Sequence, residues 1–400
     1  MIRTQFKYTL RASFIGYIVQ AIVNNFAPLL FLTFQRNYGI SLERIAFLVT
    51  LNFGIQLCID LLASKFATKI GYRNCIVFAH FAAAAGLIGM TIFPEIFRHP
   101  YWGLLLATVL YAVGGGLLEV LISPIVEACP SEKKEAQMSL LHSFYCWGQC
   151  LVVLLSTLFF AVFEIKNWKI MALGWAILPL VNGFLFTQVP IRTLEETRKE
   201  KQSTKRLFQN KLFWLLLLIM FGAGATELAM SQWASAFAEE GLGVSKTVGD
   251  LAGPCTFALL MGLARLLYAK HSHRIKLEQG ILCSSLLGIA GYLIAALASL
   301  PIISLMGCAL CGAAAGILWP GTYSIAAKEL PMGGTAMFAL LALAGDLGCA
   351  AGPTLVGLVS DAANGNLKTG LLTAIFFPAL LTVGISYLIR KKKTKNRQEI

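Results

Sequence analysis

Residues 101–128 read YWGLLLATVLYAVGGGLLEVLISPIVEA and contain only two charged side chains, Glu119 and Glu127. An α-helix rises about 1.5 Å per residue, so roughly 20 apolar residues cross the hydrocarbon core of a bilayer. The rest of the chain has the same character, with a mean hydropathy of +0.71. Of its 400 residues 57% are hydrophobic and 13% are charged, against roughly 25% charged in an average soluble domain. The composition therefore predicts a membrane protein.

Comparable apolar stretches recur along the chain, divided by Pro, Gly and charged residues. The first of them is too long for the apolar core of a signal peptide and lacks a small-residue cleavage site, so we expect it to span the membrane. The predicted fold class is an all-α membrane protein with twelve transmembrane helices. The expected spans are residues 8–34, 43–64, 74–94, 101–128, 136–163, 168–188, 212–238, 245–270, 277–298, 301–327, 334–360 and 368–389.

The basic residues are distributed unevenly over the loops between these spans. About 25 Lys and Arg fall on the side that holds both termini and about 7 on the other, which the positive-inside rule reads as cytoplasmic termini. This bias also accounts for the net charge of +13. The charges are scattered over loops and form no basic face, so nucleic acid is not an expected partner.

The spans fall into two sets of six. We expect an N-terminal six-helix bundle over residues 1–190 and a C-terminal one over 212–390, which together form two pseudo-symmetric bundles. The segment 191–211 is rich in Glu, Lys and Arg and is expected to be a basic cytoplasmic linker, and 391–400 a basic cytoplasmic tail.

Internal similarity supports a repeat. The sequence from Asp60 to Lys65, DLLASK, aligns with RLLYAK from Arg265 to Lys270. Between the fourth and tenth spans, Gly116 precedes Pro124 by eight positions, as Gly312 precedes Pro320. Repeats of this kind are typical of secondary transporters, whose substrate sites lie near the bilayer midplane where the repeats meet.

With these features the chain resembles the major facilitator superfamily (MFS), and the resemblance covers nearly its full length. The superfamily's loop signature after the second span is present in altered form as SKFATKIGYR over residues 64–73, with Ser64 and Thr68 in place of the expected Gly and Asp. The segments GLLE ending at Glu119 and HSFYCWG starting at His142, with Glu227 in the seventh span, look like the fucose-permease-like sugar symporter branch. The resemblance implies two bundles that rock about a central cavity lined by spans one, four, seven and ten.

Ionisable residues within a span are costly by about 2.5 to 3.5 kcal/mol each, so each invites a functional hypothesis. The candidates for proton coupling are Glu119, Glu227 and Asp346. Asp60 and Arg265 occupy equivalent repeat positions with opposite charge, and we expect them to act as gate or packing charges.

Spacing on the helices gives three polar stripes. Gln20 with Asn24, Glu119 with Ser123, and Glu227 with Ser231 are each separated by four residues, so each pair is expected to share one helix face.

Glu119 is the leading proton carrier, because a carboxyl group in a poorly hydrated cavity can alternate between neutral and charged forms. The alternative is a permanent ion pair or a fixed hydrogen bond. Related sugar symporters also carry an acid in the first helix, where this chain has Asn24 and Asn25. Glu227 has the same two interpretations.

Aromatic rings and amides suit a neutral polyhydroxylated solute, through flat apolar contact and directional hydrogen bonds. His142, near the inner end of the fifth span, is a further polar candidate or a fixed hydrogen-bond donor. The alternative for every aromatic candidate is ordinary helix packing or an interfacial belt. The substrate-binding candidates are Asn25, Trp147, Gln149, Gln232, Trp233 and Trp319.

The predicted function is secondary active transport of a small solute, with a sugar as the leading class, by alternating access and with protons as the driving ion. The alternatives are an integral membrane enzyme and a sensor of the same fold that transports nothing. We expect no enzymatic activity, no cofactor and no metal. The expected partners are a small-molecule substrate, protons and the lipid bilayer of the plasma membrane. We expect the protein to be a monomer.

Overall fold

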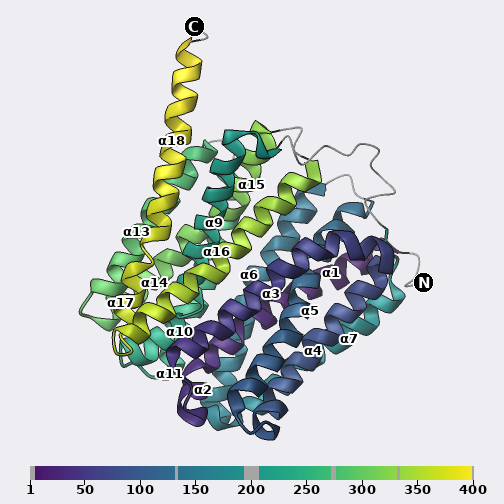
Figure 1. The fold of residues 1–400 in the computed structure, drawn as a ribbon, viewed down its shortest axis with the longest axis vertical. Coiled ribbons are helices and arrows are strands. Elements are labelled where there is room, and N and C mark those ends of the chain that lie inside the picture. Colours follow the sequence, from purple (N-terminus) through teal and green to yellow (C-terminus); the bar gives the residue numbers. More distant parts are fainter. Residues whose placement is uncertain (1–4, 131–133, 193–206, 272–275, 331–333, 399–400) are drawn as a thin grey trace. The chain divides into compact units, whose positions relative to one another are not determined.

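The computed structural model describes residues 5–130, 134–192, 207–271, 276–330 and 334–398. Every regular element in these ranges is a helix, and the described residues include twelve helical segments long and apolar enough to cross a membrane. The predicted all-α class with twelve spans is therefore confirmed. The chain forms two compact units, Met1–Glu200 and Lys201–Ile400 (Figure 1). Their boundary falls within the expected linker, of which residues 193–206 lie outside the described ranges.

The first unit contains six spans, drawn from purple to teal in Figure 1. Its first span is broken near Pro28, which has no N–H to donate and ends the regular α-helix. The elements are α1 (Phe6–Asn25), the 3₁₀ turn η2 (Ala27–Leu30), α2 (Phe31–Tyr38), α3 (Leu42–Ile70), α4 (Tyr72–Ile96), α5 (Pro100–Ala128), α6 (Lys134–Phe163), η3 (Ile165–Asn167) and α7 (Trp168–Gln188).

Glycines let the helices of this unit approach closely. A Cβ on Gly86 would lie 2.4 Å from the backbone nitrogen of Tyr111, and one on Gly114 would lie 2.5 Å from that of Ala83. These two contacts join α4 to α5. Small residues of this kind are favoured between membrane helices, where packing and not water exclusion drives association.

A buried histidine joins three helices of the first unit. His80 is fully buried, with Nδ1 2.7 Å from the carbonyl oxygen of Ile76 and Nε2 2.7 Å from Nδ2 of Asn182. The same Asn182 nitrogen donates to the Ala12 carbonyl at 3.0 Å. A neutral imidazole that donates from Nδ1 and accepts at Nε2 fits all three contacts, so His80 is a structural link between α1, α4 and α7.

Arg73, in the loop signature, closes the end of α7. Its guanidinium donates to the carbonyl oxygens of Phe186, Thr187 and Val189 at 2.7, 2.9 and 2.8 Å. The last carbonyls of a helix lack intrahelical partners, and a cation at that end is favoured by the helix dipole. Gly71, with φ +93°, makes the turn between α3 and α4 that brings Arg73 to this place.

The second unit also contains six spans, and four of them are broken. The breaks coincide with Pro254, Pro320 and Pro378 and with two π-helical segments. The elements are α9 (Lys211–Ser231), α10 (Ala234–Ala236), η5 (Phe237–Gly241), α11 (Lys246–Asp250), η6 (Leu251–Cys255), α12 (Thr256–His271), α13 (Leu277–Leu297), α14 (Pro301–Ala315), α15 (Leu318–Glu329), α16 (Gly334–Ala362), α17 (Leu367–Thr373) and α18 (Phe376–Gln398).

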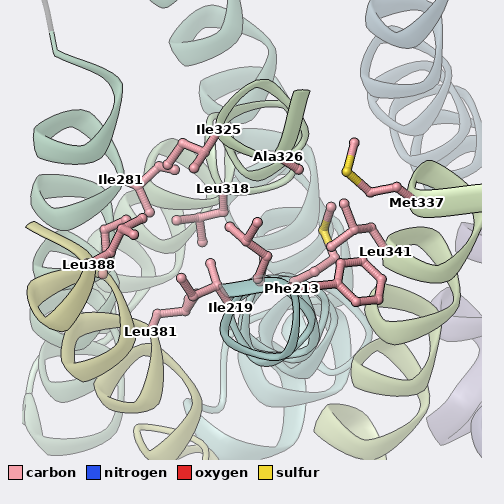
Figure 2. Close-up of a cluster of buried hydrophobic side chains, with 14 of the residues drawn as sticks. Phe213, Ile219, Ile281, Leu318, Ile325, Ala326, Met337, Leu341, Leu381 and Leu388 are labelled. Atoms are coloured by element: carbon pink, nitrogen blue, oxygen red, sulfur yellow. The ribbon is translucent and has the colours of Figure 1, made fainter. Parts of the chain in front are cut away.

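A buried apolar cluster lies among five helices of this unit. Figure 2 shows side chains from α9, α13, α15, α16 and α18 converging on one another. Close van der Waals packing of these side chains holds the five helices together. Labelled members are Phe213, Ile219, Ile281, Leu318, Ile325, Ala326, Met337, Leu341, Leu381 and Leu388.

Helix α18 continues through most of the expected tail, to Gln398. Lys392 on this helix forms ion pairs with Glu329, at 2.6 Å, and with Glu278. The end of α18 is therefore tied to α13 and α15.

The repeat proposed from the sequence has a counterpart in the packing. A Cβ on Gly116 of α5 would lie 3.0 Å from Cα of Gln56 on α3, and one on Gly312 of α14 would lie 2.2 Å from the carbonyl oxygen of Phe257 on α12. The paired glycines thus allow the same kind of close helix contact at corresponding places in the two units.

Candidate functional site

Buried amides in the first unit form a continuous hydrogen-bond network that ends on Glu119. Gln20 Nε2 donates to Glu119 Oε2 at 2.9 Å and to Gln56 Oε1 at 3.2 Å. Gln56 Nε2 donates in turn to the side-chain oxygens of Asn24 and Asn52, both at 2.9 Å, and Asn52 Nδ2 donates to Asn24 at 3.1 Å. We call these five residues the amide network. The amide network joins α1, α3 and α5, which are predominantly apolar helices.

The four amides of this network are at most 5% exposed, whereas Glu119 is partly exposed. Oε1 of Gln20 receives no hydrogen bond from any described residue. The network thus keeps one amide oxygen available beside a carboxyl group, in a region where an unmade hydrogen bond is costly.

The predicted polar stripes are confirmed for the first unit. Glu119 reaches Gln20, and Ser123, one turn further along α5, lies 2.8 Å from the hydroxyl of Tyr17 on α1. Gln20 and Asn24 both contact Gln56 of α3. Both predicted pairs of this unit therefore share one helix face.

Gly115 makes room for the network. A Cβ at this position would lie 2.9 Å from Val23, 3.3 Å from Oε1 of Gln20 and 3.5 Å from Nε2 of Gln56. The middle glycine of the triplet at 114–116 therefore serves the polar layer, and its neighbours serve helix packing.

In the second unit, two charged candidates that were predicted separately lie together. Glu227 on α9 is 6% exposed, and its Oε2 lies 4.0 Å from Nη2 of Arg265 on α12. Arg265 also donates from Nε to the carbonyl oxygen of Gly316 at 3.0 Å. Oε2 of Glu227 accepts no hydrogen bond from the described residues. Its contact with Arg265 is therefore an electrostatic attraction at 4.0 Å and not a hydrogen bond.

The two remaining acids differ in burial. Asp346 on α16 is 3% exposed, next to Gly345, where a Cβ would lie 2.3 Å from the ring of Trp319. Asp60 is partly buried, one turn beyond Gln56 on α3 and thus on the same helix face as the amide network. Asp60 and Arg265 belong to different units of the chain.

Three substrate candidates of the first unit differ in burial. Asn25 is buried and donates from Nδ2 to the Ala21 carbonyl at 2.9 Å and toward the Tyr145 hydroxyl at 3.4 Å. Gln149 is 2% exposed, beside the contact of Gly148 with α1. Trp147 is 38% exposed, on the same face of α6 as the exposed Leu151 and Leu158. Trp147 is therefore placed with apolar surface residues and not with the amides.

Two of the three candidates of the second unit contact α16. Trp233 is fully buried and donates from Nε1 to the Pro353 carbonyl at 2.9 Å, and its neighbour Gln232 is 2% exposed. The ring of Trp319 lies only 2.3 Å from where a Cβ on Gly345 would be. Both tryptophans thus pack against α16, and Trp319 is the one partly open to its surroundings.

Sequence reasoning missed two sets of polar residues. Asn52 and Gln56 are central to the amide network, and their separation by four residues in an apolar span was the available signal. Asp250 is fully buried at the start of the eighth span, where it accepts from Ser235 and pairs with Lys246 at 3.0 Å. Asp250 lies near the start of the predicted span 245–270, where a charged residue is usually assigned to the adjacent loop.

Two six-span units with polar residues buried inside apolar helices define a multi-pass membrane protein of transporter architecture. The sequence profile of the Major Facilitator Superfamily matches residues 12–397, and the chain belongs to this superfamily. The superfamily is one of transporters, which favours transport over enzymatic activity. No curated protein sequence matches the chain.

Solved structures share the fold at low sequence identity. FucP, the E. coli fucose:proton symporter, was solved in an outward conformation; it is 17% identical, with 94% of this chain and 98% of that chain covered and a TM-score of 0.65. A D-xylose-proton symporter is 14% identical, with 95% of each chain covered and a TM-score of 0.77. A bacterial homologue of the human lysosomal transporter Spinster, inward-facing and occupied, is 13% identical, with 97% of each chain covered and a TM-score of 0.70. The predicted resemblance to the superfamily, and to fucose-permease-like structures within it, is confirmed at the level of the fold.

Proposed function

We propose that this protein is a secondary active transporter that moves a small polyhydroxylated solute, with a sugar as the leading class, by alternating access. The amide network is the observation that carries the proposal. It presents amide groups and one carboxyl group within an apolar helix bundle, and these are the groups that bind hydroxyls directionally. Membership of the superfamily and the two sugar:proton symporters among its structural neighbours support the same class of solute.

Glu119 is the proposed proton carrier. It is the ionisable member of the network and is partly exposed, so a proton has access to it. Protonation would remove the negative charge that accepts from Gln20, and the amide would then be released toward a substrate hydroxyl. Glu227 and Asp346 are the further acids proposed for coupling, and both are nearly fully buried.

Asn25, Gln149, Gln232, Trp233 and Trp319 remain proposed substrate contacts, and Trp147 has the weakest support because it lies on an exposed apolar face. We further propose that both termini lie in the cytoplasm, because most Lys and Arg of the loops fall on the side of the termini. A monomer in the plasma membrane completes the proposed arrangement.

The proposal is tested by uptake of a panel of labelled sugars and polyols into proteoliposomes under an imposed pH gradient. Wild-type protein is expected to accumulate at least one of them. Glu119→Gln is expected to lose gradient-driven accumulation while it retains counterflow exchange, because the amide can still hydrogen-bond but cannot carry a proton.

Glu164→Gln is the matched control, because it makes the same change in the same unit on a side chain that is 69% exposed and forms an ion pair with the nearby Lys166. It is expected to transport as wild type does. Unchanged accumulation by Glu119→Gln removes Glu119 from the coupling role. Absence of flux for every solute favours the sensor or enzyme alternatives.

A further inference from the structure

The tenth span is broken at a point where proline removes a backbone hydrogen bond. Helix α14 ends at Ala315 and α15 begins at Leu318. Pro320 has no N–H, so it cannot donate to the carbonyl four residues earlier, which is that of Gly316. A carbonyl left unpaired within a membrane costs several kcal/mol, so it needs another donor, either from a neighbouring helix or from a local rearrangement of the backbone.

Arg265 supplies this donor from another helix. Its Nε lies 3.0 Å from the Gly316 carbonyl oxygen, while Nη2 of the same guanidinium lies 4.0 Å from Glu227 and 3.8 Å from the sulfur of Met261. One side chain thus contacts α9, its own α12 and the break between α14 and α15.

The packing around the break brings Arg265 within reach. A Cβ on Gly316 would lie 2.7 Å from Cβ of Ala264 and 2.9 Å from the Met261 carbonyl, so α12 runs directly against the broken segment. The arginine is 18% exposed and Glu227 8%, measured on their side chains, so solvent does little to replace either contact.

A similar break in the twelfth span is resolved without a side chain. There Pro378 leaves the carbonyl of Ala374 without its usual donor, and the backbone N–H of Phe377 donates to it at 3.1 Å. In both breaks a proline leaves a carbonyl without its usual donor. The backbone supplies the new donor in the twelfth span, whereas Arg265 supplies it in the tenth, so the break in the tenth span depends on Arg265.

We propose that Arg265 is a positioning residue that fixes the bend of the tenth span by holding the Gly316 carbonyl, with Glu227 orienting its guanidinium. The direction in which α15 continues from α14 then depends on this one contact. The consequence for uptake rests on the proposed transport function, whereas the consequence for helix α15 does not.

The test combines hydrogen–deuterium exchange of the full-length protein in nanodiscs with proteoliposome uptake. Arg265→Gln is expected to speed exchange in peptides covering residues 318–329 by roughly tenfold, as loss of a charge-assisted hydrogen bond predicts. Peptides from 301–311 should change little. In uptake, the variant should lower the maximal rate and leave KM nearly unchanged, because Arg265 does not touch the solute.

Pro320→Ala provides the decisive rescue. It restores an N–H for the Gly316 carbonyl, so Pro320→Ala combined with Arg265→Gln should recover the protection of α15. Pro378→Ala in the same Arg265→Gln background is the matched control and should recover nothing. If Arg265→Gln alone does not fold, the Pro320→Ala double variant is still expected to fold.

The proposal is overturned if Pro320→Ala fails to restore protection, or if the double variant also fails to fold. It is likewise overturned if Glu227→Gln restores protection in the Arg265→Gln background, because Arg265 would then serve only to neutralise the carboxylate. If exchange follows the expected pattern but no protein takes up any solute, the proposed transport function fails and the assignment of Arg265 stands.

Discussion

The contribution of a single buried polar residue to this protein should increase with the number of hydrogen bonds that it makes. Gln56 contacts three partners in the amide network and Asn52 contacts two. An amide side chain that both donates and accepts has only one orientation that satisfies three partners, so Gln56 also fixes which end of each neighbouring amide faces it.

Gln56→Leu is therefore expected to weaken uptake and lower the apparent melting temperature more than Asn52→Leu. Each stranded polar group costs about 1 to 3 kcal/mol. Thermal unfolding in detergent and initial uptake rates would measure both variants side by side. Equal effects from the two substitutions would contradict the central place of Gln56.

His80 and His142 make a matched pair of histidines in the first unit. His80→Leu removes the acceptor of one N–H of the buried Asn182 amide and the ring's contact with the Ile76 carbonyl, so we expect it to destabilise the protein by about 1 to 3 kcal/mol. His142 is exposed and rests its ring against Tyr17, so His142→Leu should change stability by less than about 0.5 kcal/mol. Thermal unfolding curves of the two variants would compare them. A larger loss from His142→Leu would show that His80 is not the link described above.

At the scale of elements, the seam between α9 and α16 is made of backbone. A Cβ on Gly348 would lie 2.0 Å from the Phe221 carbonyl oxygen, and one on Gly352 would lie 2.5 Å from that of Ala225. Small residues on α16 around Asp346 allow this close crossing.

Gly348→Ala is expected to force the two helices apart at a cost of about 1 to 3 kcal/mol, as overpacking does. Gly54→Ala is the control, since a Cβ there meets nothing within 4 Å. Alanine favours a helix over glycine by about 0.8 to 1 kcal/mol, so this control should be neutral or stabilising. Melting temperatures in the same detergent would separate the two, and a stable Gly348→Ala would show that the seam yields.

At the scale of the whole molecule, the orientation of the chain in the membrane is open to a direct test. The basic residues predict that both termini lie in the cytoplasm. A fluorescent protein fused after Ile400 should fluoresce in a bacterial host, and alkaline phosphatase at the same place should be inactive. Alkaline phosphatase fused after Ala298, in a predicted outer loop, should be active. The reverse pattern would invert the assignment.

The twelve spans were predictable because hydropathy depends on composition and length alone. The i, i+4 polar pairs were predictable because helix periodicity places them on one face. The link from Arg265 to Glu227 and to the Gly316 carbonyl was not, since it joins α12 to α9 and to the break after α14 and arises only when those helices pack. The break itself follows from Pro320, but its donor depends on a neighbouring helix.

The glycine seams have a consequence for entropy. Ordering a side chain such as Leu or Ile costs about 0.5 to 1 kcal/mol in rotamer freedom, whereas Gly and Ala have none to lose. Contacts such as Gly348 with Phe221 and Gly312 with Phe257 meet at the backbone, so they separate and re-form without freezing or freeing a rotamer at the glycine. The Leu and Ile cluster among α9, α13, α15, α16 and α18 carries that entropic cost whenever it repacks. Sliding between helices should therefore occur first along the glycine seams, while that cluster moves as one body.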